Sequence, residues 1–185
     1  MSRTETMKKS LRATNQVRWI TITGVFTALN IILASLPIPT PTGNIYLCDM
    51  IICTAALLLD PVAAFVVGGI GSFIGDMLMY PAAMFVSLFT HGLQAVAVSL
   101  IAHSNIGTSK HAQFLRALIA TLVGAVIMVV GYSIGNAFFY GDKSMATAIV
   151  KIPKNTTQSL FGAVMSLLIC YKAGLAKIFA KMELD

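Results

Sequence analysis

Apolar stretches about as long as a membrane-spanning helix follow one another through this chain of 185 residues. A helix needs roughly 17 to 25 mostly apolar residues to cross the hydrocarbon core of a bilayer. Hydrophobic residues make up 57% of the sequence and charged residues only 11%, whereas about one quarter of an ordinary soluble domain is charged. A chain this short has too much surface to hide so many apolar side chains from water. Lipid is therefore the expected solvent for most of it, and the expected fold is all-α.

Breaks in the apolar pattern divide the chain into six expected transmembrane helices of one integral membrane domain, residues 1–185, with residues 1–14 as an N-terminal tail. The expected helices cover residues 17–36, 47–59, 62–80, 82–102, 115–140 and 156–178. The second is short for a span, so it is expected to tilt, to thin the bilayer or to begin earlier in the preceding loop. Three prolines and a glycine in residues 37–44 disfavour helix, so this segment is expected to form an ordered turn or lid.

Lysine and arginine residues are distributed unevenly between the two sides of such a bundle. If the N-terminus lies inside, three of the 13 basic residues fall on the outer side, namely Lys143, Lys151 and Lys154, and these are expected to be solvated loop charges. The other ten fall on the inner side, and they are Arg3, Lys8, Lys9, Arg12, Arg18, Lys110, Arg116, Lys172, Lys177 and Lys181. Basic flanks stay in the cytoplasm, so both termini are predicted to be cytoplasmic. The net charge of +6 then sets orientation and does not indicate nucleic-acid binding.

The sequence lacks the motifs of common enzyme, cofactor and metal sites. It contains no GxxxxGK[ST] segment for ATP and no HExxH segment for zinc, and His103 and His111 fall in an expected loop. Cys48, Cys53 and Cys170 have no CxxC spacing and are expected to be apolar packing residues. No paired aspartates and no serine–histidine dyad share a depth in the membrane, which disfavours an intramembrane protease. We therefore predict no catalytic residue, no cofactor and no metal.

The segment GGIGSFIGDMLMYP, residues 68–81, combines small residues with one carboxylate. Gly71 and Gly75 form a GxxxG pair, which lets helix backbones approach closely in a bilayer. Gly24 and Ala28 make a similar pair in the first span. Asp76 falls roughly 6 Å below the outer end of its span, given a rise of about 1.5 Å per residue. This depth predicts a structural residue that frames a pocket and remains near interfacial water.

Polar residues inside the expected spans are concentrated toward the outer side. They are Asn30, Asp49, Asp76, His91, Tyr132, Ser133, Asn136, Asn155, Thr156, Gln158 and Ser159. Such residues are costly in lipid unless they face protein or a water-filled cavity. A pore or a symmetric alternating-access carrier would need polar counterparts in the inner half. The pattern therefore predicts a pocket that opens to the outside and has no path through the membrane.

Several of these residues also have purely structural interpretations. Asn155 and Thr156 suit N-caps at the start of the sixth span, and Gln158 occupies the position of a capping-box partner. Tyr132 suits an aromatic anchor at the membrane interface. His91 suits a neutral imidazole that bonds to a neighbouring helix. Both interpretations stay open at the level of the sequence.

Six short segments follow one another in a specific order along the chain. They are GVFTALN, IYLCDMIICTAALLLDP, GGIGSFIGDML, FTHGLQAV, GYSIGNAFFYG and NTTQSLFGAV. In this order and spacing the sequence resembles the S component, the substrate-binding membrane subunit, of an energy-coupling factor (ECF) vitamin transporter. The similarity runs through nearly the whole chain and is greatest to the branch with riboflavin-type and pyrimidine- or pyridoxine-type S components.

The resemblance implies a multi-pass protein of the cell membrane that captures a vitamin or a precursor from outside. It implies two kinds of partner, a transmembrane coupling subunit (the T component) and two ATP-binding cassette ATPases. The coupling subunit would dock on Gly24 and Ala28, although the family favours alanine at both positions. The pocket would form between the first loop and the fourth to sixth helices. The expected substrate-binding residues are Asn30, Tyr46, Phe85, His91, Tyr132, Asn136, Asn155 and Gln158.

The sequence leaves several substrates open. A neutral, compact vitamin such as pyridoxine or hydroxymethylpyrimidine fits the scarcity of charges in the expected pocket. Pantothenate is a rival, because Lys151 or Lys154 could meet its carboxylate. Riboflavin would need more aromatic area than the sequence assigns to the pocket. A self-sufficient small channel or secondary carrier is the alternative from a different functional class.

Overall fold

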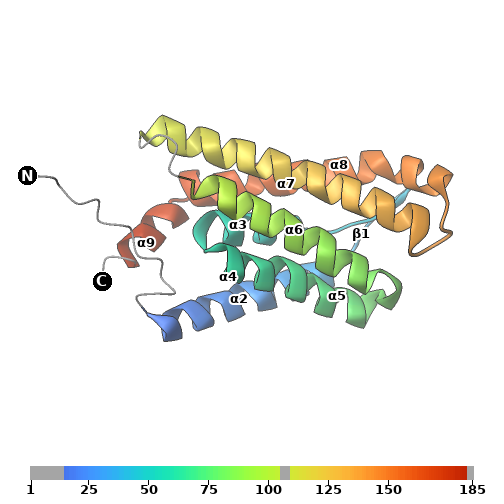
Figure 1. Ribbon diagram of the computed structural model, residues 1–185, viewed down its shortest axis with the longest axis horizontal. Coiled ribbons are helices and arrows are strands. Elements are labelled where there is room, and N and C mark those ends of the chain that lie inside the picture. Colours follow the sequence, from blue (N-terminus) through green and yellow to red (C-terminus); the bar gives the residue numbers. More distant parts are fainter. Residues whose placement is uncertain (1–14, 105–108, 183–185) are drawn as a thin grey trace, which may run out of the picture.

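The computed structural model describes residues 15–104 and 109–182, which form a bundle of helices with one short hairpin (Figure 1). Its elements are, in chain order, α2 (Gln16–Ala34), β1 (Ile38–Thr40), β2 (Gly43–Ile45), α3 (Cys48–Leu58), α4 (Pro61–Phe65), the π-helical turn η1 (Val66–Ile70), α5 (Gly71–Met79), the 3-10 turn η2 (Pro81–Ala83), α6 (Met84–Ala102), α7 (Lys110–Phe138), α8 (Met145–Leu167), the π-helical turn η3 (Leu168–Lys172) and α9 (Leu175–Met182). The prediction of an all-α membrane protein is confirmed in its class.

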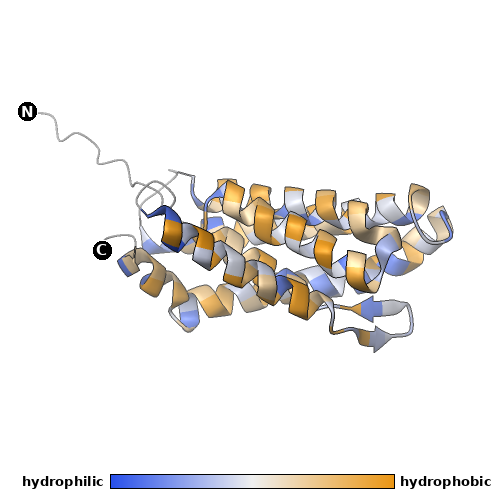
Figure 2. Ribbon diagram, turned by 90° about the horizontal axis from the view of Figure 1, so that it is seen from below, coloured by the Kyte–Doolittle hydropathy of each residue, from blue (hydrophilic) through white to orange (hydrophobic). Residues whose placement is uncertain are grey.

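Four helical stretches of the described chain are long and apolar enough to cross a membrane. They are Gln16–Ala34, Pro61–Met79, Pro81–Ala102 and Lys110–Phe138. A fifth is added if Met145–Lys172 and Leu175–Met182, which meet at a bend of 59°, count as one broken span. Large apolar side chains cover the outer surface of the bundle, and hydrophobic residues run along the length of the helices (Figure 2). An apolar outer surface of this extent suits lipid as the surrounding solvent.

The short helix α3 lies inside the bundle. Its 11 residues span about 16 Å, which is too little to cross a bilayer alone. Nine of them are buried, and the helix packs against α2, α6 and α8. It begins at Cys48 and does not extend into the preceding loop. Protein surrounds this helix on most sides, and the count of six spans remains a prediction.

The last long helix differs from its prediction. Residues 141–155 were expected to be a loop, but α8 begins at Met145 and contains Pro153. The helical stretch ends at Lys172, before the expected residue 178, because Gly174 adopts a φ of +80° and α9 then turns away. A search for long apolar runs does not find this early start, because the first turns of α8 are amphipathic. Ile149 and Val150 are exposed on one face and Ala148 is buried on the other.

The early start of α8 also corrects the capping interpretations. Asn155 and Thr156 lie inside the helix, so neither is its N-cap, and Ser144 takes that position. Gln158 is likewise no capping-box partner, because its side chain bonds to the backbone N–H of Tyr46 and to Asp49. Its amide therefore joins separate parts of the fold.

The proline-rich segment was expected to be ordered, and it forms an ordered β-hairpin. Strands β1 and β2 pair antiparallel, with Ile38 opposite Ile45 and Thr40 opposite Gly43. The Thr40 hydroxyl donates a hydrogen bond to the carbonyl oxygen of Gly43, whose φ of +123° is accessible to glycine but strained for other residues. The hairpin therefore has a defined shape despite its prolines.

Small residues bring the helices close together, as the GxxxG pair predicted. A Cβ added to Gly71 would lie 2.7 Å from the Asn30 side chain, and one added to Gly75 would lie 3.0 Å from the Ala34 Cβ. These contacts join α5 to α2. Gly68, one turn earlier, faces α6 instead, where an added Cβ would lie 2.6 Å from the backbone oxygen of His91. The short segment from Gly68 to Gly75 therefore packs closely against both α2 and α6.

Both ends of the described chain lie at one end of the bundle (Figure 1). The guanidinium of Arg18, near the start of α2, donates a hydrogen bond of 2.7 Å to the backbone oxygen of Met182 in α9. The two ends of the described chain therefore lie together at one end of the bundle, and their placement on the cytoplasmic side of the membrane remains a prediction. Of the basic residues behind it, Arg3, Lys8, Lys9 and Arg12 lie outside the described residues, as does the N-terminal tail.

We expect Gly68→Ala to destabilise the protein by roughly 1–3 kcal/mol, because the new methyl group would overlap the α6 backbone and a second side chain. Gly24→Ala is the matched control, since an added Cβ at Gly24 meets no atom within 4 Å. Thermal unfolding of both variants in detergent measures the difference. Equal unfolding temperatures for Gly68→Ala and wild type would contradict the close packing of α6 on η1.

Candidate functional site

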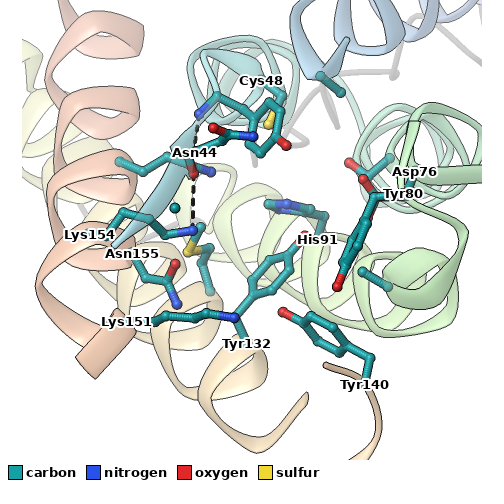
Figure 3. A pocket seen from close by; sticks show the side chains of 17 residues that line it. Asn44, Cys48, Asp76, Tyr80, His91, Tyr132, Tyr140, Lys151, Lys154 and Asn155 are labelled. Atoms are coloured by element: carbon teal, nitrogen blue, oxygen red, sulfur yellow. Dashed lines mark hydrogen bonds between the residues drawn. The ribbon is translucent and has the colours of Figure 1, made fainter. Parts of the chain in front are cut away.

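A cavity of about 210 Å³ lies between the hairpin and the ends of the long helices (Figure 3). Residues of the hairpin, of α2, α3, α5, α6, α7 and α8, of η2 and of the segments that connect them contribute to its walls. The lining residues are Ala34, Gly43, Asn44, Tyr46, Cys48, Ser72, Asp76, Tyr80, Ala83, His91, Met128, Tyr132, Tyr140, Lys151, Lys154, Asn155 and Gln158. The cavity thus lies at the hairpin end of the bundle, away from the two ends of the described chain (Figure 1).

Aromatic rings form much of the cavity wall. Four of the five tyrosines of the chain line it. The rings of His91 and Tyr132 meet edge to face at 5.3 Å between centroids, and those of Tyr80 and Tyr140 do so at 6.1 Å. Aromatic surfaces arranged in this way suit a planar ring. Two of these rings, Tyr80 and Tyr140, are additional to those that the sequence named for the pocket.

A buried hydrogen-bond chain runs beneath the cavity and centres on Asp49, which is 1% exposed. Its Oδ1 accepts a bond of 2.8 Å from Gln94 Nε2, and its Oδ2 accepts a bond of 2.6 Å from Gln158 Nε2. Gln158 Oε1 accepts a bond of 2.9 Å from the backbone N–H of Tyr46. Gln94 Oε1 lies 2.7 Å from His91 Nδ1. The chain therefore joins the base of the hairpin to α3, α6 and α8.

A second hydrogen-bond chain begins at Asp76 on α5. The Ser87 hydroxyl of α6 donates to the Asp76 carboxylate, and Ser87 Oγ lies 2.6 Å from Tyr132 Oη of α7. Asp76 and Tyr132 both line the cavity, while Ser87 is fully buried behind them. A single carboxylate thus links three helices at the cavity wall.

Lys151 and Lys154 are half-buried in the cavity wall, so the expectation of solvated loop charges is wrong. Lys151 Nζ donates a bond of 2.7 Å to Asn136 Oδ1, and Lys154 Nζ donates one of 3.0 Å to the backbone oxygen of Asn44 in the hairpin. With Asn155 and Gln158, the two lysines follow the spacing i, i+3, i+4, i+7 of one helix face. That spacing was the signal in the sequence for a cavity-facing helix.

Asn155 carries an unused hydrogen-bond donor. The residue is 3% exposed and lines the cavity, yet its Nδ2 has no hydrogen-bond partner within the part of the chain that the structure describes. Buried polar atoms in proteins are almost always paired, and an exception calls for an explanation such as a bound molecule. Asn155 Nδ2 is therefore a free hydrogen-bond donor at the cavity wall.

The cavity brings together five of the eight residues that the sequence named for substrate binding. They are Tyr46, His91, Tyr132, Asn155 and Gln158. Phe85 is 58% exposed and packs against Phe73, away from the cavity. Asn30 is buried against η1 and α5, where its Nδ2 donates to the Val67 oxygen at 2.7 Å and to Ser72 Oγ at 3.2 Å. Asn136 lies behind the wall, where it bonds to Lys151 and Tyr140.

Two tyrosines and two lysines are among the cavity residues that the sequence did not name for substrate binding. Tyr80 and Tyr140 belong to turns at this end of the bundle, and Lys151 and Lys154 belong to the first turns of α8. The tyrosines had no distinguishing spacing. Only their position near the ends of apolar spans pointed to this end of the molecule.

Cys48, Asp49 and His91 place one potential metal-ligand atom each within 4.8 Å of one another. Both oxygens of Asp49 already accept hydrogen bonds from glutamine amides, and His91 Nδ1 is bonded to Gln94. A metal ion would have to displace these bonds. The geometry of the cluster is thus that of a hydrogen-bond chain.

Two comparisons with known proteins bear on this site. A family model described as "ECF-type riboflavin transporter, S component" matches residues 14–177. A protein of Pyrococcus woesei described as "Uncharacterized protein in gap 3'region" is 27% identical over 133 residues, which cover 72% of this chain and 84% of that protein. The matched family region includes every residue of the cavity.

We expect Gln158→Leu to loosen the hairpin, because the variant removes the acceptor for the Tyr46 N–H and one of the two donors to Asp49. Leaving buried polar groups unpaired costs about 1–3 kcal/mol each. Hydrogen exchange at residues 36–46 should accelerate, and the unfolding temperature should fall. Thr157→Leu, on the exposed face one residue earlier, is the control. An unchanged rate of hydrogen exchange in the hairpin of Gln158→Leu would show that this contact does not hold the hairpin.

Proposed function

Because this chain belongs to the family of ECF-type riboflavin transporter S components, we propose that its cavity binds a water-soluble vitamin or vitamin precursor for ATP-driven uptake. Membership makes the chain a substrate-binding subunit of a membrane transporter that works with a T component and ATPases. The observation that carries the proposed site is the unpaired Asn155 Nδ2 in a tyrosine-lined cavity. On this account, the chain performs no covalent chemistry, and the partner ATPases supply the energy.

For the ligand we propose a compact ring compound such as pyridoxine or hydroxymethylpyrimidine. The cavity volume of about 210 Å³ is smaller than the roughly 300–1,000 Å³ of pockets that hold drug-sized ligands. Tyrosine rings can cover the faces of one aromatic ring, and amide, hydroxyl and imidazole groups can satisfy its polar substituents. Both features favour a small heterocycle with several polar groups.

Two further ligands are supported by particular observations. The description of the matching family and the four tyrosines of the wall favour riboflavin. Lys151 and Lys154 favour a ligand with a carboxylate, such as pantothenate, because a lysine ammonium binds an anion strongly in a partly buried site. The cavity volume ranks both behind the compact ring compounds.

We also propose that the T component docks on the face of α2 that carries Gly24 and Ala28. Both residues are exposed on the outer surface of the bundle, and an added Cβ at Gly24 meets no atom within 4 Å. Residues four apart lie on one helix face, and small side chains there let a second helix approach closely. α2 therefore offers a helix-packing surface that the described part of the chain leaves open.

The proposed function is tested with the purified protein in lipid nanodiscs and in liposomes. Titration with pyridoxine, hydroxymethylpyrimidine, riboflavin and pantothenate should give tight binding of one compound, with the first two favoured. Liposomes that contain this chain alone should show no sustained uptake of that compound, and addition of the T component and ATPases with ATP should start it. Sustained uptake by the chain alone would indicate a secondary carrier or channel and overturn the proposal.

We expect Asn155→Leu to weaken binding of that vitamin about 10- to 100-fold, the equivalent of roughly 1–3 kcal/mol for a lost hydrogen bond to a buried group. Thermal stability should not fall, because Nδ2 has no partner to lose in the free protein. Gln158→Leu provides the contrast, since it removes two existing bonds and should lose stability. Calorimetric titration and thermal unfolding measure the two effects. Wild-type affinity in Asn155→Leu would exclude this residue from the site.

A further inference from the structure

Each of the two buried hydrogen-bond chains at the cavity has a fixed direction. A backbone N–H and a lysine ammonium only donate, and an ionised carboxylate only accepts. A side-chain amide and a hydroxyl do both, so their direction follows from the neighbours they bond. Once a chain contains one group that can only donate or only accept, the direction of every other hydrogen bond in that chain is determined.

The first chain is fixed at the hairpin. Gln158 Oε1 must face the Tyr46 N–H, so Gln158 Nε2 donates to Asp49. Gln94 Nε2 donates to the other Asp49 oxygen, which turns Gln94 Oε1 toward His91 Nδ1. An amide oxygen only accepts, so the proton of a neutral His91 ring lies on Nδ1. Nε2 of this ring has no hydrogen-bond partner among the described residues, and it carries a free lone pair.

The second chain is fixed at Asp76. Ser87 has a single hydroxyl proton, and the Asp76 carboxylate receives it. The bond of 2.6 Å between Ser87 Oγ and Tyr132 Oη must then use the proton of the tyrosine. The remaining lone pair of Tyr132 Oη is therefore available to the cavity. His91 and Tyr132, whose rings are in contact, thus both offer acceptors and form an acceptor side of the cavity.

The α8 wall has the opposite character. Lys151, Lys154 and Asn155 gather there, across the cavity from Asp76 and His91, and form a donor side (Figure 3). Each lysine ammonium has three N–H bonds and uses one of them within the described protein. Asn155 Nδ2 uses none. Free donors therefore face free acceptors across the cavity.

We propose that Asp49 and Asp76 are positioning residues that orient the two chains, so that His91 Nε2 and Tyr132 Oη accept hydrogen bonds from the ligand while α8 donates to it. The ligand then binds in one orientation. Its amino or hydroxyl edge faces α6 and α7, and its ring nitrogen, carbonyl or anionic edge faces α8. This inference rests on the proposed function in one respect, because it takes the cavity as the ligand site. It adds that specificity is set by two carboxylates, Asp49 behind the cavity wall and Asp76 in the wall itself.

Nitrogen NMR of histidine tests the first chain in the ligand-free protein. The three histidines are labelled with ¹⁵N in lipid nanodiscs at about pH 8, where a free imidazole is neutral, and His91 is assigned by the signals lost in His91→Gln. We expect the proton on Nδ1 and a bare Nε2. A proton on Nε2, in a neutral or a doubly protonated ring, would overturn the proposal without any need for a variant.

Variants separate the role of Asp49 from general stability. In Asp49→Asn the Gln94 amide can turn over, so the His91 proton should shift from Nδ1 to Nε2 or divide between them. Asp142→Asn, which makes the same change of charge in an exposed turn, should leave the His91 signals unchanged. A His91 spectrum in folded Asp49→Asn identical to wild type would count against Asp49 as the positioning residue. If Asp49→Asn does not fold, the wild-type tautomer still decides the direction of the chain.

The second chain has its own spectroscopic test. The tyrosine Fermi doublet in Raman spectra reports whether a phenol donates or accepts, and the signal of Tyr132 is isolated by subtracting the spectrum of Tyr132→Phe. We expect Tyr132 to be a donor in wild type and to lose that character in Ser87→Ala. A wild-type Tyr132 that only accepts would overturn this half of the proposal. Both tests read the free protein, so a failed vitamin titration would overturn the proposed function and leave the bond directions as measured.

Discussion

The buried carboxylate of Asp49 fixes how the helices around the cavity meet. In an apolar interior, an ionised carboxylate without hydrogen-bond donors is strongly destabilising, and breaking one buried charged contact costs about 3–5 kcal/mol. Gln94 of α6 and Gln158 of α8 supply the two donors, so both helices must hold their position relative to α3. The same glutamine of α8 also holds the base of the hairpin. One ionisable group in the core thereby determines the position of two cavity walls and of the lid.

This arrangement depends on glycine at the contact points. A Cβ at Gly162 would lie 2.5 Å from the Cβ of Asp49, so only glycine lets α8 come close enough for Gln158 to reach the carboxylate. Gly68 plays the same part between η1 and α6, directly beside His91. In lipid no hydrophobic effect drives the helices together, and close backbone packing with a few polar bonds has to do so. The close packing at the glycines and the hydrogen bonds to Asp49 therefore act together to hold the helices in place.

The apolar spans, the GxxxG contact and the ordered hairpin were readable from the sequence because each follows from a local pattern. The start of α8 was not, because a criterion based on apolar length reads Lys151, Lys154 and Pro153 as a loop. In the fold, this segment has exposed apolar side chains on one face and the polar cavity on the other, so the lysines do not interrupt it. Among the site residues, His91, Asn155 and Gln158 could be found from their depth in the membrane. Asn30 could not be told apart from them, because depth does not reveal whether a side chain faces a cavity or a neighbouring helix.

The helix that carries the donor side of the cavity, α8, also holds the hairpin. Lys154 holds the backbone of Asn44 and Gln158 holds that of Tyr46, so both polar links from α8 to the hairpin lie within two turns of Asn155. Any displacement of α8 must therefore move the lid and the ligand donors together. Under the proposed function, this link couples opening of the hairpin to release of the ligand. No separate gate is then required, because one helix carries both the links to the hairpin and the proposed donors to the ligand.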